Sequence, residues 1–567
     1  MKFLIRTLFL CAIGGIGPGA GSLQAQPPAT PVAVPTPVVA PTSVVTPTPA
    51  ESPPSAFLTA PRVFCVPALP ATFNPQRLEA DDPAQWVGLA FDRLLDYDRE
   101  SRQLRPALAE SWQMADDGLS LTVRLRPGVS VHSTPDFTPS RPLTADDVVF
   151  SFEKQRAPDH PFHNVGGRRY PGFSDFGLDK RLSKVEAVDA RTVRFSFQAA
   201  DPGFLPLLAQ DFAVIVSAEQ AAFLSAQGQS ERLEILPAGT GPYQIMGRDP
   251  EGRLALQAFR RHWRNRPPLP AGAGRSPDSL LLQAIPEPAL RYARLANGRC
   301  DGASDPDPAE LPAIGRDPQV RSLPVPGFQM LLLVFDVTRK PFDDARVRQA
   351  IAAIIDRPAL VREFLWNAGR VLDAPLPPDA WPAPETPAGS DLLKARERLL
   401  EAGQPNGFAA DLRILGSVAA LLPDTQRLAE RLQIQLAQIG VRVRIRTGPP
   451  RPMPTASRSS GGEPVLAPSP QLYLLAVAPP TEPLAALSRL LGCPAAREGG
   501  GNSGQWCLPA FDAALSAAAA APAGPAREQA LATALDLLAR YRPVVPLAAI
   551  PRQNLLRSDL PAGLHLP

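Results

Sequence analysis

The sequence has few of the residues on which catalytic and metal sites depend. Only five histidines and five cysteines occur among 567 residues, and the histidines are scattered. It contains no G-x-S-x-G nucleophile motif, no H-E-x-x-H helix and no G-x-x-x-x-G-K-[ST] phosphate loop. His160 and His163 stand three residues apart, but Pro161 between them argues against a helix that would place both rings on one face. The sequence therefore predicts no catalytic residue, no metal site and no cofactor.

A strong charge of either sign is also missing. Lys and Arg total 58 and Asp and Glu total 55, so the formal net charge of +3 is small for this length. Nucleic acids and acidic surfaces attract proteins through clustered positive charge. We therefore expect no nucleic-acid partner.

The N-terminus has the pattern of a secretory signal. Lys2 begins a positive end, Phe3–Ile16 is the apolar core, and residues 23–25 form a cleavage site. The apolar run is too short to anchor the chain in a bilayer. Cys11 raises the alternative of lipidation, but Leu10 is too large for the position that precedes a lipidated cysteine. We expect a cleaved signal and export to the periplasm.

Residues 26–60 consist almost entirely of Pro, Ala, Val, Thr and Ser. Repeated proline removes N–H donors and favours extended polyproline II, so no packed core is expected here. The simpler interpretation is a disordered tether. The alternative is a semi-rigid spacer that crosses an envelope layer.

Both strand and helix patterns occur in the remainder, which indicates an α/β protein. Ser120–Arg126 alternates apolar and polar residues, the period of a half-buried strand. Thr144 and Asp147 stand at the start of a predicted helix, where hydroxyl and carboxylate groups interact well with free N–H groups. Another strand is predicted at 253–259, and further helices are predicted at 345–355, 425–439, 510–521 and 526–540.

The order of these segments resembles one protein family closely. The matching segments are PALAESW (106–112), LRPGV (125–129), TADDVVFSF (144–152), GTGPYQI (239–245), RYARLANGRCD (291–301) and YRPVVPLA (541–548). They are similar to the signature of extracytoplasmic solute-binding proteins of family 5, the peptide/nickel/oligopeptide class of ABC importers. The run HPFHNVGGRRYPGF (160–173) is similar to the dipeptide-binding subgroup.

The resemblance implies a two-lobed periplasmic binding protein fold (type II, cluster C) with an inserted small α/β domain. The predicted parts are a signal peptide at 1–25, the tether at 26–60, a discontinuous lobe I at 61–92, 240–322 and 540–567, the inserted domain at 93–239, and lobe II at 323–539.

Four cysteines remain after signal removal, which allows three connectivities. An oxidising periplasm disfavours free thiols, and the absence of a C-x-x-C motif disfavours zinc. The family resemblance implies the pairs Cys65–Cys300 and Cys493–Cys507.

The resemblance also implies where a ligand binds in lobe II, and there the sequence departs from the family. The family's ammonium-binding Asp follows a Gly-Trp-Thr-Gly run, and the matching position is Pro479, after Ala478. Glu482 stands where the family has a second, structural Asp. The family's carboxylate-binding Arg matches Ala419. A buried charge is costly without a partner, so both charged anchors for a zwitterionic dipeptide are missing.

The first lobe and the inserted domain match the family better. Thr72 and Phe73 lie in a loop, and Tyr170 in a segment, that align with ligand-contacting regions. Two interpretations stay open for Tyr170, a ligand-facing ring or a half-buried core aromatic, and a plain loop role stays open for Thr72. Residues 448–471 replace an amphipathic helix of the family with a Pro- and Gly-rich stretch.

These observations predict a periplasmic binding component that captures a peptide or related small solute by lobe closure and delivers it to an inner-membrane ABC permease. We expect a monomer and no enzymatic activity. The alternative is a diverged relative that has lost dipeptide binding and acts as an envelope interaction or sensing protein.

Overall fold

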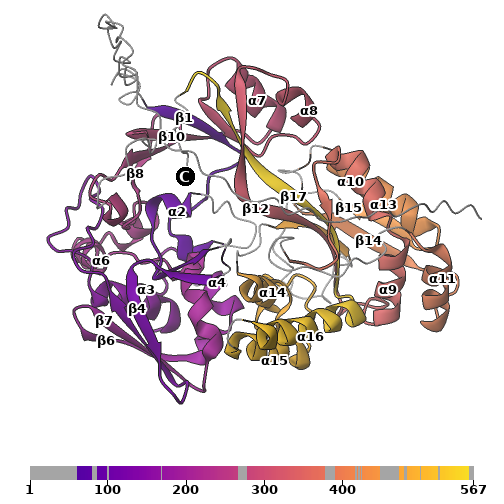
Figure 1. Ribbon diagram of the computed structural model, residues 1–567, viewed down its shortest axis with the longest axis horizontal. Helices are drawn as coiled ribbons and strands as arrows, with labels where there is room; N and C mark the ends of the chain where they lie inside the picture. The colour runs from indigo at the N-terminus through magenta and orange to yellow at the C-terminus, as the bar shows by residue number, and fades with distance from the viewer. Residues whose placement is uncertain are drawn as a thin grey trace, which may run out of the picture. The chain divides into compact units, whose positions relative to one another are not determined.

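The computed structural model describes residues 61–78, 86–98, 101, 103–167, 169–265, 277–376, 390–415, 418, 422, 424–446, 472–477, 482–497, 500–521 and 524–560 (Figure 1). All of them belong to one unit of the chain, residues 53–567. The predicted signal peptide and tether lie outside the described residues. No helix in the described part is long and apolar enough to cross a membrane.

One large sheet runs through the described structure. Its strand order is β15 (Arg442–Arg446), β14 (Ala409–Ile414), β16 (Leu472–Val477), β12 (Val320–Phe335), β17 (Val544–Arg557), β11 (Gly302–Ser304), β1 (Arg62–Val66), β10 (Ser279–Ala284), β9 (Leu254–Ala258) and β8 (Tyr243–Arg248), with β13 (Arg370–Val371) paired to β17. β14 is parallel to β15 and β16, and β1 is parallel to β10 and β11. The other neighbours are antiparallel.

The two longest strands, β12 and β17, join the two ends of this sheet. They pair antiparallel along most of their lengths, from Val320 with Arg557 to Val334 with Val544. Figure 1 shows them crossing between the β1–β10 end and the β14–β15 end. Their register breaks between Val325 and Phe328, where prolines reduce the number of ladder donors. A second shift in register lies between Leu331 and Leu332.

The β12–β16 end of the sheet is covered on both faces by helices. Leu472 and Leu474 of β16 belong to one core with α9 (Ala345–Ile354), α10 (Arg357–Leu365), α11 (Leu392–Glu401) and α13 (Thr425–Ala437). The intervening Tyr473 and Leu475 belong to a second core with α14 (Pro483–Leu491), α15 (Pro509–Ala520) and α16 (Pro525–Tyr541). Successive side chains of a strand point to opposite faces, so an almost wholly apolar strand is buried between two helical layers.

A separate four-stranded antiparallel sheet lies within residues 93–239. Its order is β4 (Ala109–Met114), β5 (Ser120–Leu125), β7 (Thr192–Phe197) and β6 (Leu182–Asp189), next to the hairpin of β2 (Leu95–Asp98) and β3 (Gln103–Pro106). α3 (Ala145–Arg156) packs on it through Val148 and Phe152. The strand predicted at 120–126 is β5, and the helix predicted from 144–152 is α3. Both lie in the core of this four-stranded sheet.

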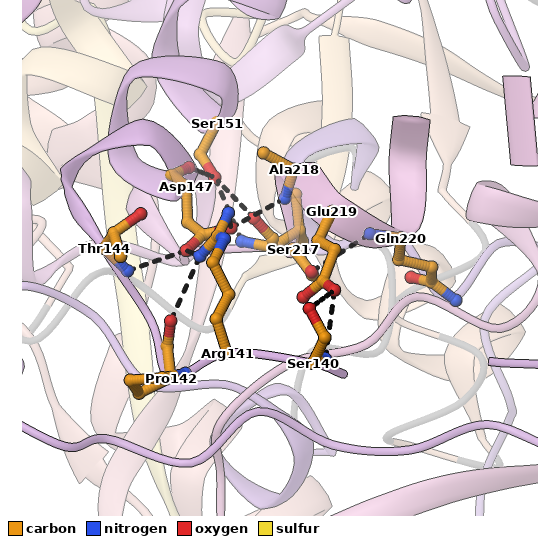
Figure 2. A network of polar contacts seen from close by, with 11 residues as sticks. Ser140, Arg141, Pro142, Thr144, Asp147, Ser151, Ser217, Ala218, Glu219 and Gln220 are labelled. Carbon is orange, nitrogen blue, oxygen red and sulfur yellow. Dashed lines mark hydrogen bonds and ion pairs between the residues drawn. The ribbon is translucent and has the colours of Figure 1, made fainter. Parts of the chain in front are cut away.

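Asp147 fixes the start of α3 (Figure 2). Its buried carboxylate accepts hydrogen bonds from the backbone N–H groups of Thr144 (2.8 Å) and Ala218 (2.8 Å), and from Arg141 at 2.7 and 3.1 Å. Ser151, one turn later, accepts from the N–H of Val216. The TADDVVFSF segment thus ties α3 to the start of α6 (Ala218–Ala226).

The predicted helices agree with α9, α13, α15 and α16 to within a few residues, and the strand predicted at 253–259 is β9. Cys65 and Cys300 form a disulfide, and so do Cys493 and Cys507. The first pair lies in a small core with Ile285, Leu295 and Leu555.

Candidate functional site

Two of the predicted ligand-contacting residues bind Glu234, Thr72 through its carboxylate and Phe73 through its backbone carbonyl. The Thr72 hydroxyl lies 3.2 Å from Glu234 Oε2, and Asn74 Nδ2 donates to Oε1 at 2.9 Å. The Phe73 N–H donates to the Glu234 backbone carbonyl at 3.0 Å. The loop around Thr72 is therefore held by a residue 162 positions away in the sequence.

The Phe73 ring is buried in a hydrophobic core with Trp86 and Tyr243. It meets Trp86 edge-on with the ring centroids 5.5 Å apart, and the guanidinium of Arg248 lies 5.4 Å from its centroid. The buried Phe73 ring thus anchors the loop that carries Thr72 to the hydrophobic core.

Arg77 connects Glu234 to Tyr170. Its Nε lies 3.2 Å from Glu234 Oε2, and its Nη2 donates to the Tyr170 hydroxyl at 3.1 Å. The same guanidinium donates to the carbonyls of His163, Val165 and Arg169. Arg77 therefore holds the turn between α3 and α4 (Pro171–Asp175), the segment predicted to be non-helical from Pro161 and the glycines.

Two glycines let this turn approach the network closely. A Cβ at Gly166, whose φ is +72°, would lie 2.3 Å from Glu234 Cγ. Gly167, with φ +132°, would place a Cβ 3.7 Å from Arg77. Both conformations strongly favour glycine.

Tyr170 is a core residue of the inserted sheet in this structure. It is 2% exposed, its ring lies 4.3 Å below the Arg77 guanidinium carbon, and its hydroxyl donates to the Phe162 carbonyl at 3.3 Å. Burial raises the pKa of the Tyr170 hydroxyl to about 12, although Arg77 acts in the opposite direction. The structure thus brings Thr72, Phe73 and Tyr170 together around Glu234 and Arg77, and the Tyr170 ring faces protein.

Lys154 lies beside the same network. Its side chain is buried, and its ammonium lies 5.3 Å from the Phe150 ring centroid. Burial lowers the pKa of Lys154 to about 8, Glu234 opposes this shift, and Arg77 adds to it. The Lys154 carbonyl bonds His163 Nδ1 at 2.8 Å, so this histidine stabilises a turn.

Glu482 lies apart from that cluster, at the N-terminus of α14. Its carboxylate accepts from the Ala485 N–H at 2.7 Å and from Arg527 at 2.9 Å, and its side chain is 1% exposed. Burial raises the pKa of Glu482, while the Ala485 N–H and Arg527 lower it. These contacts satisfy the carboxylate with a helix end and an arginine of α16. The predicted positions Ala419, Ala478 and Pro479, and residues 448–471, lie outside the described residues.

A third polar cluster holds the GTGP turn. Asp92 accepts from Thr240 Oγ1 and Trp263 Nε1, each at 2.9 Å, and lies 3.4 Å from His262 Nε2. Burial opposes the ionisation of Asp92, but these three neighbours outweigh it and lower its pKa. A Cβ at Gly241 would lie 2.6 Å from backbone atoms of Ala90 and Phe91. The motif is thus a close backbone contact that any side chain at Gly241 would prevent.

His132 binds the same turn through Nε2, 2.8 Å from the Gly241 carbonyl. Its burial lowers the pKa of His132 to about 4. In the described ranges, no group of three or more His, Cys, Asp or Glu side chains is arranged to hold a metal ion.

Asp175, at the end of α4, is a charged contact that the sequence did not indicate. It accepts from Arg497 Nη2 at 2.8 Å and from the Gly501 N–H at 3.2 Å, and Arg489 Nε lies 3.5 Å away. Burial raises the pKa of Asp175, while Arg489 and Arg497 oppose the shift. These partners come from α14 and from the loop closed by Cys493 and Cys507.

Comparisons with known proteins place these features in a family. Residues 103–491 match the family described as bacterial extracellular solute-binding proteins, family 5. Heme-binding protein A of Haemophilus influenzae is 36% identical over 383 residues, which cover 67% of this chain and 69% of that protein. Di/tripeptide-binding protein 1 of Pseudomonas aeruginosa is 31% identical over 492 residues, which cover 86% of this chain and 88% of that protein.

A solved structure is similar over nearly the whole length of the described chain. It is a dipeptide-binding protein from Pseudoalteromonas in complex with Met-Leu, with a TM-score of 0.75 and 27% identity. The match covers 88% of this chain and 96% of that chain.

Proposed function

The chain belongs to family 5 of the bacterial extracellular solute-binding proteins, and we propose that it is the periplasmic substrate-binding component of an ABC importer for peptides or related small solutes. The observation that carries this proposal is the family match across residues 103–491. The fold agrees with it, because it is similar to that of a dipeptide-binding protein with a TM-score of 0.75. The fold prediction is confirmed: this is the mixed α/β fold of periplasmic binding proteins, with an additional small antiparallel sheet. The family consists of binding proteins rather than enzymes.

Capture of the solute proceeds by closure of lobe II on lobe I and the inserted domain. The register break between Val325 and Phe328 in β12 supports a hinge there, because hinges need only a few residues that change φ and ψ. A solute drives closure only by binding the closed state more tightly than the open one. The closed form then docks on a permease in the inner membrane, and the binding protein acts as a monomer.

The solute lacks one or both terminal charges of a simple dipeptide. Pro479 and Ala419 stand where the family has its ammonium-binding Asp and its carboxylate-binding Arg. A zwitterion enclosed there would have no ionic partner from these two positions. One charged hydrogen bond contributes about 1.5–3 kcal/mol, and an unpaired buried charge costs more. Glu482 does not replace the missing Asp, because Arg527 and a helix end occupy its carboxylate.

Two measurements on the periplasmic protein test this proposal. Native mass spectrometry of protein purified without denaturant identifies the co-purified solute. Calorimetry with Ala-Ala and Met-Leu then measures dipeptide affinity, which we expect to be at least about a hundredfold weaker than that of a relative with both anchors. Submicromolar binding of these dipeptides would refute the assigned ligand class.

A second candidate function is an envelope interaction or sensing role without transport. The replacement of both charged anchors and the altered segment at 448–471 favour it. Absence of any co-purified solute, together with normal growth on peptides after deletion of the gene, would favour this role. Loss of uptake of the identified solute after deletion would favour the importer.

A further inference from the structure

Asp175 joins two parts of the chain that are predicted to move relative to each other. It lies in the predicted inserted domain, 322 residues from Arg497 in the predicted lobe II. Its side chain is 1% exposed, whereas Arg489 and Arg497 are 20% and 33% exposed. The carboxylate is therefore enclosed by groups from the opposite lobe.

The surroundings of Asp175 are closely packed across the same boundary. A Cβ built on Gly177 would lie 3.2 Å from Pro494, and one on Gly203 would lie 3.4 Å from Ala519. Ala485 of α14 belongs to the buried core of the inserted sheet. Figure 1 shows α4 next to α14, in agreement with the contacts between these helices. The boundary is thus closely packed around one ionic cluster, in which the Asp175 carboxylate is enclosed and the two arginines are partly exposed.

Two of the groups that bind Asp175 lie in a loop that a disulfide closes at both ends. Arg497 and the Gly501 N–H both lie between Cys493 and Cys507, which the disulfide joins over a separation of 14 residues. Gly501 permits the approach, since a Cβ there would lie 2.8 Å from the Arg489 carbonyl and 3.1 Å from Asp175 Oδ2. Asn502 stiffens the loop further by donating to the carbonyls of Gly492 and Trp506.

We propose that Asp175, Arg489, Arg497 and the Gly501 N–H form an interlobe latch that holds the protein closed without a bound solute. In a binding protein of this kind the solute normally supplies the free energy that favours closure. Here the chain supplies a charge-assisted contact of its own, made by protein groups alone.

Loss of one member of the latch should favour opening. Without the Asp175 charge, the partly buried Arg489 and Arg497 both lose their carboxylate partner, and opening lets water solvate both more fully. Replacement of Arg497 leaves Asp175 enclosed with one partner fewer. The two substitutions act on opposite sides of the same contact, so their effects should not add.

The test compares full-length variants after bound solute has been removed by reversible unfolding. Asp175→Asn and Arg497→Gln are the test variants. Glu153→Gln is the matched control, because Glu153 also binds an arginine, Arg156, and a backbone N–H, that of Val185, but wholly within the inserted domain. Circular dichroism establishes that each variant is folded, and Arg497→Gln carries the test if Asp175→Asn does not fold.

Small-angle X-ray scattering and hydrogen exchange report the outcome. We expect the solute-free parent and Glu153→Gln to share one radius of gyration, and both test variants and their double variant to share a larger one. Exchange in peptides covering 171–178 and 493–507 should become at least about tenfold faster in the test variants only. Equal radii and equal exchange in all variants would overturn the latch, as would a solute-free parent that is already open.

Discussion

Truncation of Tyr170 to alanine tests whether the ring that precedes α4 belongs to the protein core or to the solute-binding surface. The ring is 2% exposed, lies 4.3 Å from the Arg77 guanidinium and bonds both Arg77 and the Phe162 carbonyl through its hydroxyl. The substitution removes all of these contacts and leaves a cavity. We therefore expect a large loss of stability and little change in solute affinity.

The magnitude follows from what the ring contributes. Truncation of a buried aromatic to alanine costs about 3–5 kcal/mol. Tyr170→Phe keeps the ring over Arg77 and loses only the hydroxyl bonds, so we expect about 1.5–3 kcal/mol for a bond to a charged group. The phenylalanine variant thus separates the packing contribution from the polar one.

Urea unfolding followed by circular dichroism measures the stability of both variants, and calorimetry with the co-purified solute measures affinity. The control is Tyr292→Phe, which removes a hydroxyl bond to Asp317 at a half-buried site on α7 (Pro288–Ala296). A Tyr170→Ala variant with unchanged stability and affinity weakened tenfold or more would refute this assignment. It would show that the ring faces the solute.

The remaining predictions concern the disulfides, one histidine and one carboxylate. Replacing both cysteines of the Cys65–Cys300 disulfide by serine should lower the free energy of unfolding by about 5 kcal/mol, because the bond closes a loop with a sequence separation of 235 residues. The same change at Cys493–Cys507 should cost about 3 kcal/mol, because its separation is 14 residues. Urea titrations of the two variants measure the difference. Burial lowers the pKa of His132 in the folded state to about 4, below the ordinary histidine pKa of 6.5, so the unfolded chain binds the proton more readily. The contribution of the neutral His132 to stability is complete above pH 6.5, and about 3 kcal/mol is lost as the pH falls to about 4. Urea unfolding of the parent and of His132→Gln across this range should show that loss only in the parent, and identical pH profiles would contradict it. Asp147→Asn should lower stability by about 3 kcal/mol, because the buried Asp147 carboxylate accepts hydrogen bonds from Arg141 and two backbone N–H groups (Figure 2). Asp146 is exposed, so Asp146→Asn should change stability little in the same urea assay.

Local elements could be predicted from the sequence because their signals are local. α3 and α13 begin after Thr144 and Asp424, and their apolar residues repeat at helical spacing. β5 alternates buried and less buried residues along its length. Each pattern is complete within a dozen or so residues, and no distant contact reverses it.

The sites could not be predicted in the same way because their partners are far apart in the sequence. Glu234 meets Thr72 across 162 residues, and nothing near Glu234 indicates a carboxylate that holds a loop. The pair Gly166-Gly167 was the one local signal of a close approach there. Asp175 carries no local signal, because its partner Arg497 lies 322 residues away in the sequence. Glu482 was predicted by alignment to a family position, and its partner Arg527 lies 45 residues away.

β17 occupies the middle of the large sheet, although it is the last of the described strands in the sequence. It pairs with β12 on one side and β11 on the other, so it is the only strand in the described sheet order that joins the β15–β12 half to the β11–β8 half. Until residues 544–557 are in place, both halves present open edges with unpaired N–H and C=O groups, which invite association with other chains. Contacts between residues that lie far apart in the sequence also slow folding. A chain truncated before Val544 would therefore leave these two halves of the sheet with no strand between them, each with an open edge.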